Sequence, residues 1–310
     1  MQATPGTRGS PRDRAERSRL RQSAAGPEHG LVLRLVTLSA GDPAVPRLDD
    51  PGVEVWRDVA GTVSAVSFPH GSSHCLYVPR IGTFTFASSS DQIQLVPVAG
   101  AHDGLIDDAF HRIALPIALQ LHGPQVLHGS AVLTDNGVVA LCGRASAGKS
   151  TMAFAMHQRG HVLWADDAVA FCVLGDRVEA KPLPFRMRLR PESANWFDAP
   201  ELLKGSELQS PWLEAATAAT LRAVILLDPC RDSDLPDGLN MDRLAPGDAF
   251  RKLLPHAYYV SLTDESLNRR LVTSYLELAD RLPVFSLRYD PQLELVDRMC
   301  DVVERHVSAA

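Results

Sequence analysis

Residues 143–150 match the pattern G-x-x-x-x-G-K-[ST], and their surroundings constrain the fold more than any other stretch of the chain. The preceding run, residues 138–142, is short and apolar, as expected of a buried strand. The following stretch, residues 149–159, contains good helix formers without an internal glycine or proline, and Gly160 ends it. Strand, glycine-containing loop and helix in this order predict an α/β fold.

The loop between this strand and this helix is suited to binding phosphate groups. Its backbone N–H groups, together with the positive end of the helix dipole, can surround the phosphates of a nucleotide. We expect Lys149 to reach the β and γ phosphates of ATP and the Ser150 hydroxyl to complete a Mg²⁺ shell. A glycine-rich turn without a ligand is the alternative. The expected nucleotide-binding residues are Gly143, Arg144, Ala145, Ser146, Ala147, Gly148, Lys149, Ser150 and Thr151.

Two adjacent carboxylates follow the next expected strand. Residues 161–165 are largely apolar, and Asp166 and Asp167 come directly after them. Ligands of α/β sheets bind at the C-terminal ends of strands, which places both carboxylates beside the loop. One carboxylate can hold Mg²⁺ and the other can accept a proton. A solvated turn or a helix N-cap is the alternative.

The chain has 310 residues, of which 45% are hydrophobic and 22% charged, a composition typical of globular proteins. Its formal net charge of −6 and its pI near 6.0 argue against general binding to nucleic acid. We expect no membrane span and no secretory signal, because long apolar runs are missing. Five scattered cysteines without a C-x-x-C pattern favour reduced thiols, and hence a cytoplasmic location, over a zinc site.

The chain divides into three expected parts. Residues 1–29 are rich in arginine, serine, proline and glycine, which predicts a disordered tail. Residues 30–104 contain several short β-prone runs separated by turn residues, which predicts a small β-rich domain. His70 and His74 in this part are interpreted as loop residues, because no third metal ligand lies at a usable spacing. Residues 105–310 are expected to form the nucleotide-binding domain.

Within the third part, periodicity and turn residues predict further helices and strands. The helix expected at residues 107–122 contains Pro116, which should kink it. The remaining expected elements are a hairpin at 169–174 and 178–180, strands at 221–228 and 284–287, and helices at 247–254, 267–281 and 293–306.

Residues 186–190 alternate strictly between arginine and an apolar side chain. Because strand side chains point alternately to opposite faces, Arg186, Arg188 and Arg190 are expected on one face of a strand. Arginine forks suit phosphate and carboxylate groups, so this face could bind a phosphate or an acidic peptide substrate. A plain solvated strand face is an equally open interpretation.

Four short motifs of this chain resemble those of one family. They are His128-Gly129, the loop at 143–150, Gln158 to His161, and Ala165-Asp166-Asp167. Their order and spacing are similar to those of the catalytic domains of HPr kinase/phosphorylases. The similarity is greatest to HPr-kinase-like proteins encoded with ribosomally made peptides, including lasso-peptide precursor kinases. It covers residues 128–167 closely and 105–300 more loosely, and it implies a P-loop kinase domain of the HPr kinase / PEP carboxykinase type.

The resemblance also implies roles for individual residues. In that family the histidine of the H-G pair and the second aspartate of A-D-D act at the reaction centre, which maps onto His128 and Asp167. The first aspartate and the loop serine lie at the metal, which maps onto Asp166 and Ser150. The implied reaction is phosphoryl transfer from ATP to a serine hydroxyl of a peptide or small protein, with Lys149 neutralising charge and Asp167 accepting the proton. From the residues alone, His128 is interpreted as a strand-end histidine bonded to backbone.

The chain departs from the family pattern at two places. The family loop has a further glycine where this chain has Ser146, so the backbone there must adopt a conformation open to other residues. The family's glycine-rich signature after the hairpin is replaced by residues 182–190. We therefore expect kinase activity without the phosphorylase reaction, and HPr is not the expected substrate. A nucleotide hydrolase, a carboxykinase-like enzyme and an inactive nucleotide-binding module are the alternatives, and self-association into a homo-oligomer is left open.

Overall fold

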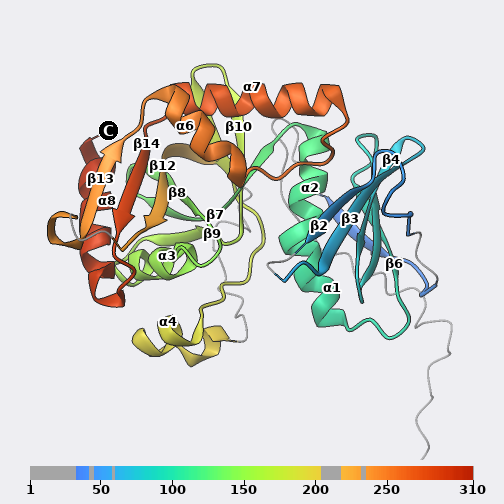
Figure 1. Ribbon diagram of the computed structural model, residues 1–310, viewed down its shortest axis with the longest axis horizontal. Helices are drawn as coiled ribbons and strands as arrows, with labels where there is room; N and C mark the ends of the chain where they lie inside the picture. Colours follow the sequence, from blue (N-terminus) through green and yellow to red (C-terminus); the bar gives the residue numbers. More distant parts are fainter. Residues whose placement is uncertain (1–32, 42–44, 58–59, 204–217, 232–234, 310) are drawn as a thin grey trace, which may run out of the picture.

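The computed structural model is a mixed α/β structure with two β-sheets (Figure 1), as the α/β part of the prediction requires. The arginine-rich tail expected at residues 1–29 lies outside the described residues. Among the described helices, none combines the length and the apolar character that crossing a bilayer requires. The structure describes residues 33–41, 45–57, 60–203, 218–231 and 235–309.

The first sheet has six strands, in the order β1-β6-β5-β4-β3-β2. Its neighbours are antiparallel except for β1 and β6, which pair in parallel. Apolar residues alternate with polar ones as in β6, where Ile93 and Leu95 are fully buried while Gln92 and Gln94 are exposed. The strands are β1 Arg34–Thr37, β2 Glu54–Arg57, β3 Val63–His70, β4 Ser73–Val78, β5 Gly82–Phe86 and β6 Gln92–Pro97.

A helical segment joins this sheet to the second one and packs on it, with Phe110 and Leu115 in one apolar cluster with Phe84 and Leu95. It starts earlier than expected, since the His102 side chain accepts a hydrogen bond from Gly104 N and caps the first turn. The expected helix is divided near Pro116. A π-helical turn precedes the proline, because a proline cannot donate a hydrogen bond to the preceding turn. The parts are α1 Asp103–Ala109, η2 Phe110–Ala114, α2 Leu115–Leu119 and η3 Gln120–His122.

The second sheet has eight strands, in the order β11-β10-β7-β8-β12-β14-β13, with β9 paired to β7. Strands β8, β12 and β14 are parallel, so their C-terminal ends meet at one edge. The expected hairpin is confirmed as β10 and β11, whereas β13 was not expected. The strands are β7 Gln125–Thr134, β8 Gly137–Gly143, β9 Val162–Ala165, β10 Ala168–Leu174, β11 Arg177–Lys181, β12 Ala219–Pro229, β13 Leu239–Arg243 and β14 Val284–Tyr289.

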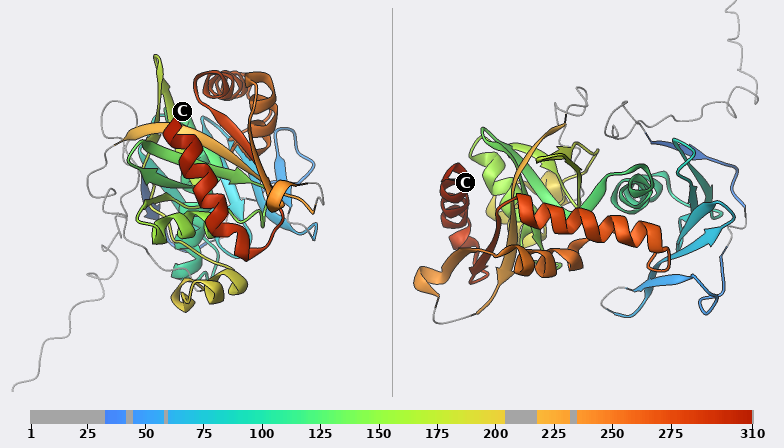
Figure 2. Two further views of the ribbon diagram at one scale, coloured as in Figure 1. Left: turned by 90° about the vertical axis from the view of Figure 1, so that its left-hand side faces the viewer. Right: turned by 90° about the horizontal axis from the view of Figure 1, so that it is seen from above.

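Helices cover both faces of this sheet (Figures 1 and 2), because alternate residues of its central strands are apolar on either side. In β8, Val139 and Leu141 pack with α3, α4 and α8, whereas Val138 and Ala140 pack with α6 and α7. The helices are α3 Lys149–Gln158, α4 Pro191–Trp196, η4 Pro200–Leu203, η5 Pro236–Gly238, α6 Pro246–Leu253, η6 Leu254–His256, α7 Glu265–Arg281, η7 Leu293–Leu295 and α8 Val296–Ala309.

The strand expected at residues 186–190 is not formed. The segment is extended but forms only a single bridge, at Met187. The predicted alternation is present, since Phe185, Met187 and Leu189 are buried in the core of the second sheet. Alternation fixes which side chains face inward, but a strand also needs a neighbouring backbone with free hydrogen-bonding groups, which the pattern does not reveal.

The two sheets are in contact through the segment that follows η6. Trp56 Nε1 of β2 donates to the Tyr259 hydroxyl at 2.5 Å, and Ser67 Oγ of β3 donates to the Val260 carbonyl at 3.1 Å. Helix α7 runs from the second sheet toward the first (Figure 1), and Arg270 on it donates to the Gln120 carbonyl. The joining helices, which pack on the first sheet, are thus also held by α7 of the second part.

Candidate active site

A cavity of about 500 Å³ lies where the chain leaves β8, β9 and β14. In parallel α/β sheets, ligands bind beyond the C-terminal ends of the strands, as this cavity would allow. Of the residues singled out in the sequence, the cavity wall includes the following: His128, Ala145, Ser146, Gly148, Lys149, Ser150, Thr151, Asp167, Arg188 and Arg190.

The loop from Gly143 to Gly148 makes a tight turn between β8 and α3. An added Cβ at Gly143 would lie 2.8 Å from the Leu227 carbonyl oxygen, so only glycine fits there. Gly148 is left-handed (φ 73°), and so is Ser146 (φ 69°), at the position where the resembling family has glycine. Arg190 Nη2 donates to Ser146 Oγ at 2.5 Å. The serine thus adopts the glycine-like conformation, with an arginine held against it.

Lys149 points back into the loop. Its ammonium donates to the carbonyls of Gly143 at 3.1 Å and Arg144 at 3.2 Å, and the residue is 9% exposed. Burial lowers the pKa of Lys149, an effect that Cys142, Asp167 and Asp166 oppose. An ammonium has three N–H groups, so this geometry leaves one of them for a phosphate oxygen in the cavity.

Asp166 lies behind Ser150 rather than on the cavity wall. Its Oδ1 accepts from Ser130 Oγ at 2.6 Å and from Ser150 Oγ at 2.8 Å. Burial and the nearby Asp167 raise the pKa of Asp166 to about 6, although the two hydroxyls and the backbone N–H of Arg188 lower it. A buried carboxylate with a raised pKa would gain from a cation next to it.

This arrangement fits Mg²⁺ better than a metal that needs an all-protein cage. Among the described residues, no group of three or more His, Cys, Asp or Glu side chains could hold a metal ion. Mg²⁺ instead prefers one or two protein oxygens and takes its other ligands from water and phosphate. The Ser150 hydroxyl and the Asp166 carboxylate supply oxygens of this kind beside the loop.

Asp167 has a backbone conformation that is rare outside glycine, with φ of 66°. Four contacts hold it. Its carboxylate Oδ2 lies 2.8 Å from Arg112 Nε, and its carbonyl accepts from His128 Nδ1, Gly129 N and Tyr258 Oη at 3.0, 3.2 and 3.3 Å. Strained residues persist where surrounding contacts over-determine them, and they cluster at functional sites.

His128 lies within β7, opposite Ala168 of β10, and not at a strand end. A carbonyl only accepts hydrogen bonds, so the bond to the Asp167 carbonyl fixes the proton on Nδ1. Burial and the charge of Lys149 lower the pKa of His128, which keeps the ring neutral near pH 7. The neutral ring has an unprotonated Nε2 that can accept a proton or hydrogen bond in the cavity. The expected bond to backbone is present, and the same bond orients a ring that lines the cavity.

The three arginines of residues 186–190 have different surroundings. Arg186 pairs with the buried Asp107 at 2.7 Å and does not line the cavity, so its expected role toward substrate is corrected to a structural one. Arg188 lies 3.4 Å from Asp108 and also lines the cavity, as does Arg190. The alternation predicts that all three arginines lie on one side of the segment. The aspartates of α1 reach Arg186 and Arg188, whereas Arg190 contacts Ser146 of the loop.

Three residues of this site were not identified from the sequence: Arg112, Ser130 and Tyr258. Arg112 comes four residues after Asp108, a spacing that indicates an ordinary ion pair on a helix surface. Ser130 and Tyr258 belong to no motif. Tyr258 Oη donates to both the Arg112 and the Asp167 carbonyl, at 3.1 and 3.3 Å. Contacts of this kind arise from the fold and leave no local signal.

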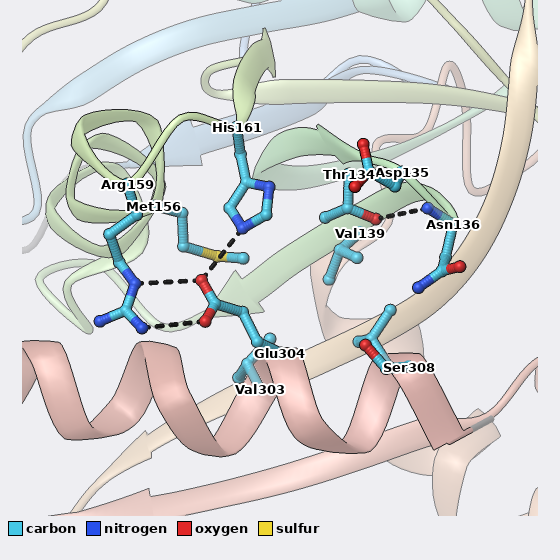
Figure 3. A pocket seen from close by; sticks show the side chains of 11 residues that line it. Thr134, Asp135, Asn136, Val139, Met156, Arg159, His161, Val303, Glu304 and Ser308 are labelled. Atoms are coloured by element: carbon cyan, nitrogen blue, oxygen red, sulfur yellow. Dashed lines mark hydrogen bonds and ion pairs between the residues drawn. The ribbon is translucent and has the colours of Figure 1, made fainter.

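A second cavity, of about 380 Å³, lies at the C-terminal ends of α3 and α8 (Figure 3). Arg159 Nε and Nη2 donate to Glu304 at 3.0 and 2.9 Å, and His161 Nε2 lies 3.0 Å from the same carboxylate. Neither Arg159 nor His161 lines the first cavity. These two residues, which contributed to the family resemblance, join α3 and the start of β9 to α8 and support the fold.

Comparison with known proteins yields weak structural similarity and no sequence match. No protein-family model matches the sequence, and no curated protein sequence matches it. Among solved structures, the chain is similar to the HPr(Ser) kinase/phosphatase from Coxiella burnetii, with a TM-score of 0.36 and 13% identity over 59% of this chain and 95% of that chain. A TM-score of this size carries no argument about function, which has to come from the residues of the cavity.

Proposed function

We propose that this protein is an ATP-dependent kinase that transfers the γ-phosphoryl group to a serine hydroxyl of a peptide or small protein. The observation that carries the proposal is that Lys149, Ser150, Asp167 and His128 line one cavity while Asp166 accepts a hydrogen bond from Ser150. A phosphate-binding loop, a hard-oxygen metal position and a proton acceptor are the parts that phosphoryl transfer requires.

The loop and Lys149 would hold the phosphates of ATP. Backbone N–H groups at the start of α3 and the ammonium of Lys149 face negative charge on the β and γ phosphates. Mg²⁺ held near Ser150 and Asp166 would supply further positive charge at the phosphates. Because the Tyr289 hydroxyl donates to the Ala147 carbonyl at 2.7 Å, the loop is fixed before the nucleotide arrives.

Asp167 would accept the proton of the attacking serine. The serine oxygen forms a bond to the γ-phosphorus as the bond from that phosphorus to the β–γ bridging oxygen breaks, and ADP leaves. The hydroxyl proton passes to the Asp167 carboxylate, and Nε2 of His128 is available to orient the hydroxyl. A positioned acid or base of this kind contributes about a hundredfold to ten-thousandfold in rate.

The charges of the cavity wall suit an acidic peptide as the phosphoryl acceptor. Arg188 and Arg190 line the cavity beside Lys149, so this wall is positive although the chain carries a net charge of −6. Arginine binds carboxylate and phosphate groups in a planar, bidentate geometry. A ribosomally made precursor peptide with acidic residues near its serine is the acceptor class we propose. We propose the forward reaction alone, because residues 182–190 stand in place of the glycine-rich signature and hold Leu183, Phe185, Met187 and Leu189 in the core.

Nucleotide binding tests the proposal at its base. ATP with Mg²⁺ should raise the thermal midpoint, because a ligand that binds only the folded state stabilises it. Lys149→Ala should reduce this increase and abolish phosphorylation of serine peptides, while Lys252→Ala, away from the cavity, should change neither. Unchanged phosphoryl transfer by purified Lys149→Ala protein would contradict the proposal.

A further inference from the structure

The cavity extends beyond the residues that the proposed reaction uses. Past Gly148 and Ser150, its wall continues along the segment after β14 and onto α8. This part of the wall is apolar, and its innermost side chains, Met152, Val296 and Met299, are each 5% exposed or less. Met152, Tyr289, Val296 and Met299 belong to the core of the second sheet, and the proposed phosphoryl transfer uses none of the surface that they present to the cavity. The apolar wall consists of Met152, Tyr289, Pro291, Leu293, Val296 and Met299.

We propose that this apolar end of the cavity binds the adenine ring of ATP, with the base between α3 and the segment 289–299. The inference rests on the proposed function, because it takes the phosphates to lie at Lys149 and Ser150. It adds a binding site for the nucleobase and names the residues that would contact it.

The positions of the other groups leave this direction for the base. Arg112, His128 and Asp167 contact one another on the cavity wall, and the proposed reaction brings the acceptor serine and the γ-phosphate to Asp167. The nucleoside must therefore extend from the phosphates along another part of the wall. Tyr289 ends β14, which pairs in parallel with β12, and β12 pairs in parallel with β8. The apolar wall thus lies at the same C-terminal sheet edge as the loop, where α/β sheets bind ligands.

The chemistry of the wall suits a flat aromatic ring. Two methionines line it, and thioether sulfurs make favourable contacts with aromatic rings. Tyr289 connects the wall to the loop, since its hydroxyl donates to the Ala147 carbonyl at 2.7 Å. Base and phosphates would therefore bind to one rigid surface.

Polar groups of the same wall can form hydrogen bonds with the base and the ribose of the nucleoside. Gln292 is exposed, and its amide offers both a donor and an acceptor, which can match the amino group and ring nitrogens of adenine. Glu192 and Ser193 of α4 line the cavity as well and offer acceptors for ribose hydroxyls. An apolar slot with a few polar groups at its edge is typical of small-molecule sites.

A comparison of ATP with inorganic tripolyphosphate tests the base site separately from the loop. Both contain the triphosphate, but only ATP contains the base, so calorimetry with Mg²⁺ should give about tenfold or tighter binding of ATP to the wild type. Leu293→Asp should remove that advantage and leave tripolyphosphate binding unchanged. Leu295→Asp is the matched control, since Leu295 follows in the same turn but lies against Gly238 and not against the cavity.

The outcomes separate the two proposals. Equal affinity of the wild type for ATP and tripolyphosphate, or an unchanged ATP affinity in Leu293→Asp, would overturn the base site and leave the kinase proposal standing. Failure of the wild type to bind either ligand would overturn both. Gln292→Ala, at an exposed position where folding is not at risk, should also weaken ATP but not tripolyphosphate binding, and should confirm the assignment if Leu293→Asp is unstable.

Discussion

Arg112 Nε lies 2.8 Å from the Asp167 carboxylate oxygen Oδ2, and this pair joins two distant parts of the chain. Arg112 belongs to the π-helical turn of the segment between the two sheets, whereas Asp167 follows β9 of the second sheet. Tyr258 strengthens the connection by donating to the carbonyls of both residues. π-Helical turns occur frequently at functional sites. The joining segment therefore sets the position of the carboxylate that we propose as the proton acceptor.

Arg112→Gln should lower the rate of phosphoryl transfer and leave ATP affinity nearly unchanged. Without the guanidinium, the Asp167 carboxylate loses the contact that directs it, and a small displacement of a reacting group can cost about a hundredfold in rate. Arg112→Lys keeps the charge and should recover part of the rate. Steady-state kinetics would check this, and a change confined to the KM for ATP would show that Arg112 acts on the nucleotide instead.

The two aspartates should respond differently to the same substitution. Asp167→Asn removes the proton acceptor, so transfer should fall by about a hundredfold or more while ATP still binds. Asp166→Asn weakens the metal position behind Ser150, so the Mg²⁺ concentration needed for half-maximal rate should rise. Titrating Mg²⁺ in both variants distinguishes them. Exchanged phenotypes would mean that the roles of the two carboxylates are reversed.

The raised pKa of Asp166, about 6, predicts a pH-dependent stability. A folded-state pKa above the ordinary value means that the folded state binds a proton more tightly than the unfolded state does. The contribution of Asp166 to the free energy of unfolding therefore decreases as pH rises from about 4 to about 7. Asp166→Asn removes this decrease. Without ligands, the free energy of unfolding of the variant should therefore increase relative to that of the wild type by roughly 2–3 kcal/mol over that range. Urea unfolding at several pH values measures the difference, and a pH-independent difference would contradict the raised pKa.

The ion pairs of the second cavity should stabilise the fold without affecting catalysis. Glu304 accepts hydrogen bonds from Arg159 and lies next to His161, and all three side chains are only partly exposed. Glu304→Gln should therefore lower the free energy of unfolding by about 1 kcal/mol. Glu265→Gln is the control, because the pair of Glu265 with Arg269 is almost fully exposed. ATP affinity should be unchanged in both. A loss of ATP affinity in Glu304→Gln alone would connect this cavity to the nucleotide site.

The sequence was most informative where structure is local. The strand, loop and helix around residues 138–159 and the pair Asp166-Asp167 are encoded in consecutive residues, and the fold class follows from such patterns. Alternation also predicted which side of residues 186–190 is buried. The alternation could not reveal that Arg186 forms an ion pair with Asp107 of α1, because that contact depends on how the joining helix packs.

Residues that act through tertiary contacts could not be identified in the same way. Ser130 meets Asp166 only because β7 and β9 are paired, and Tyr258 meets Asp167 only because the segment after η6 returns to the site. Neither residue type nor spacing distinguishes these side chains from other polar residues. The cavity itself, lined by residues from six separate stretches of the chain, is likewise a product of the whole fold.

The fate of the γ-phosphoryl group tests the central claim most directly. Purified protein is incubated with γ-labelled ATP, Mg²⁺ and a set of acidic serine-containing peptides, and labelled phosphoserine and labelled inorganic phosphate are quantified over time. We predict that the label enters phosphoserine, that it does so far faster with the wild type than with Asp167→Asn, and that little phosphate is released without peptide. Release of all label as inorganic phosphate, at the same rate with and without peptide, would contradict the account and identify a nucleotide hydrolase.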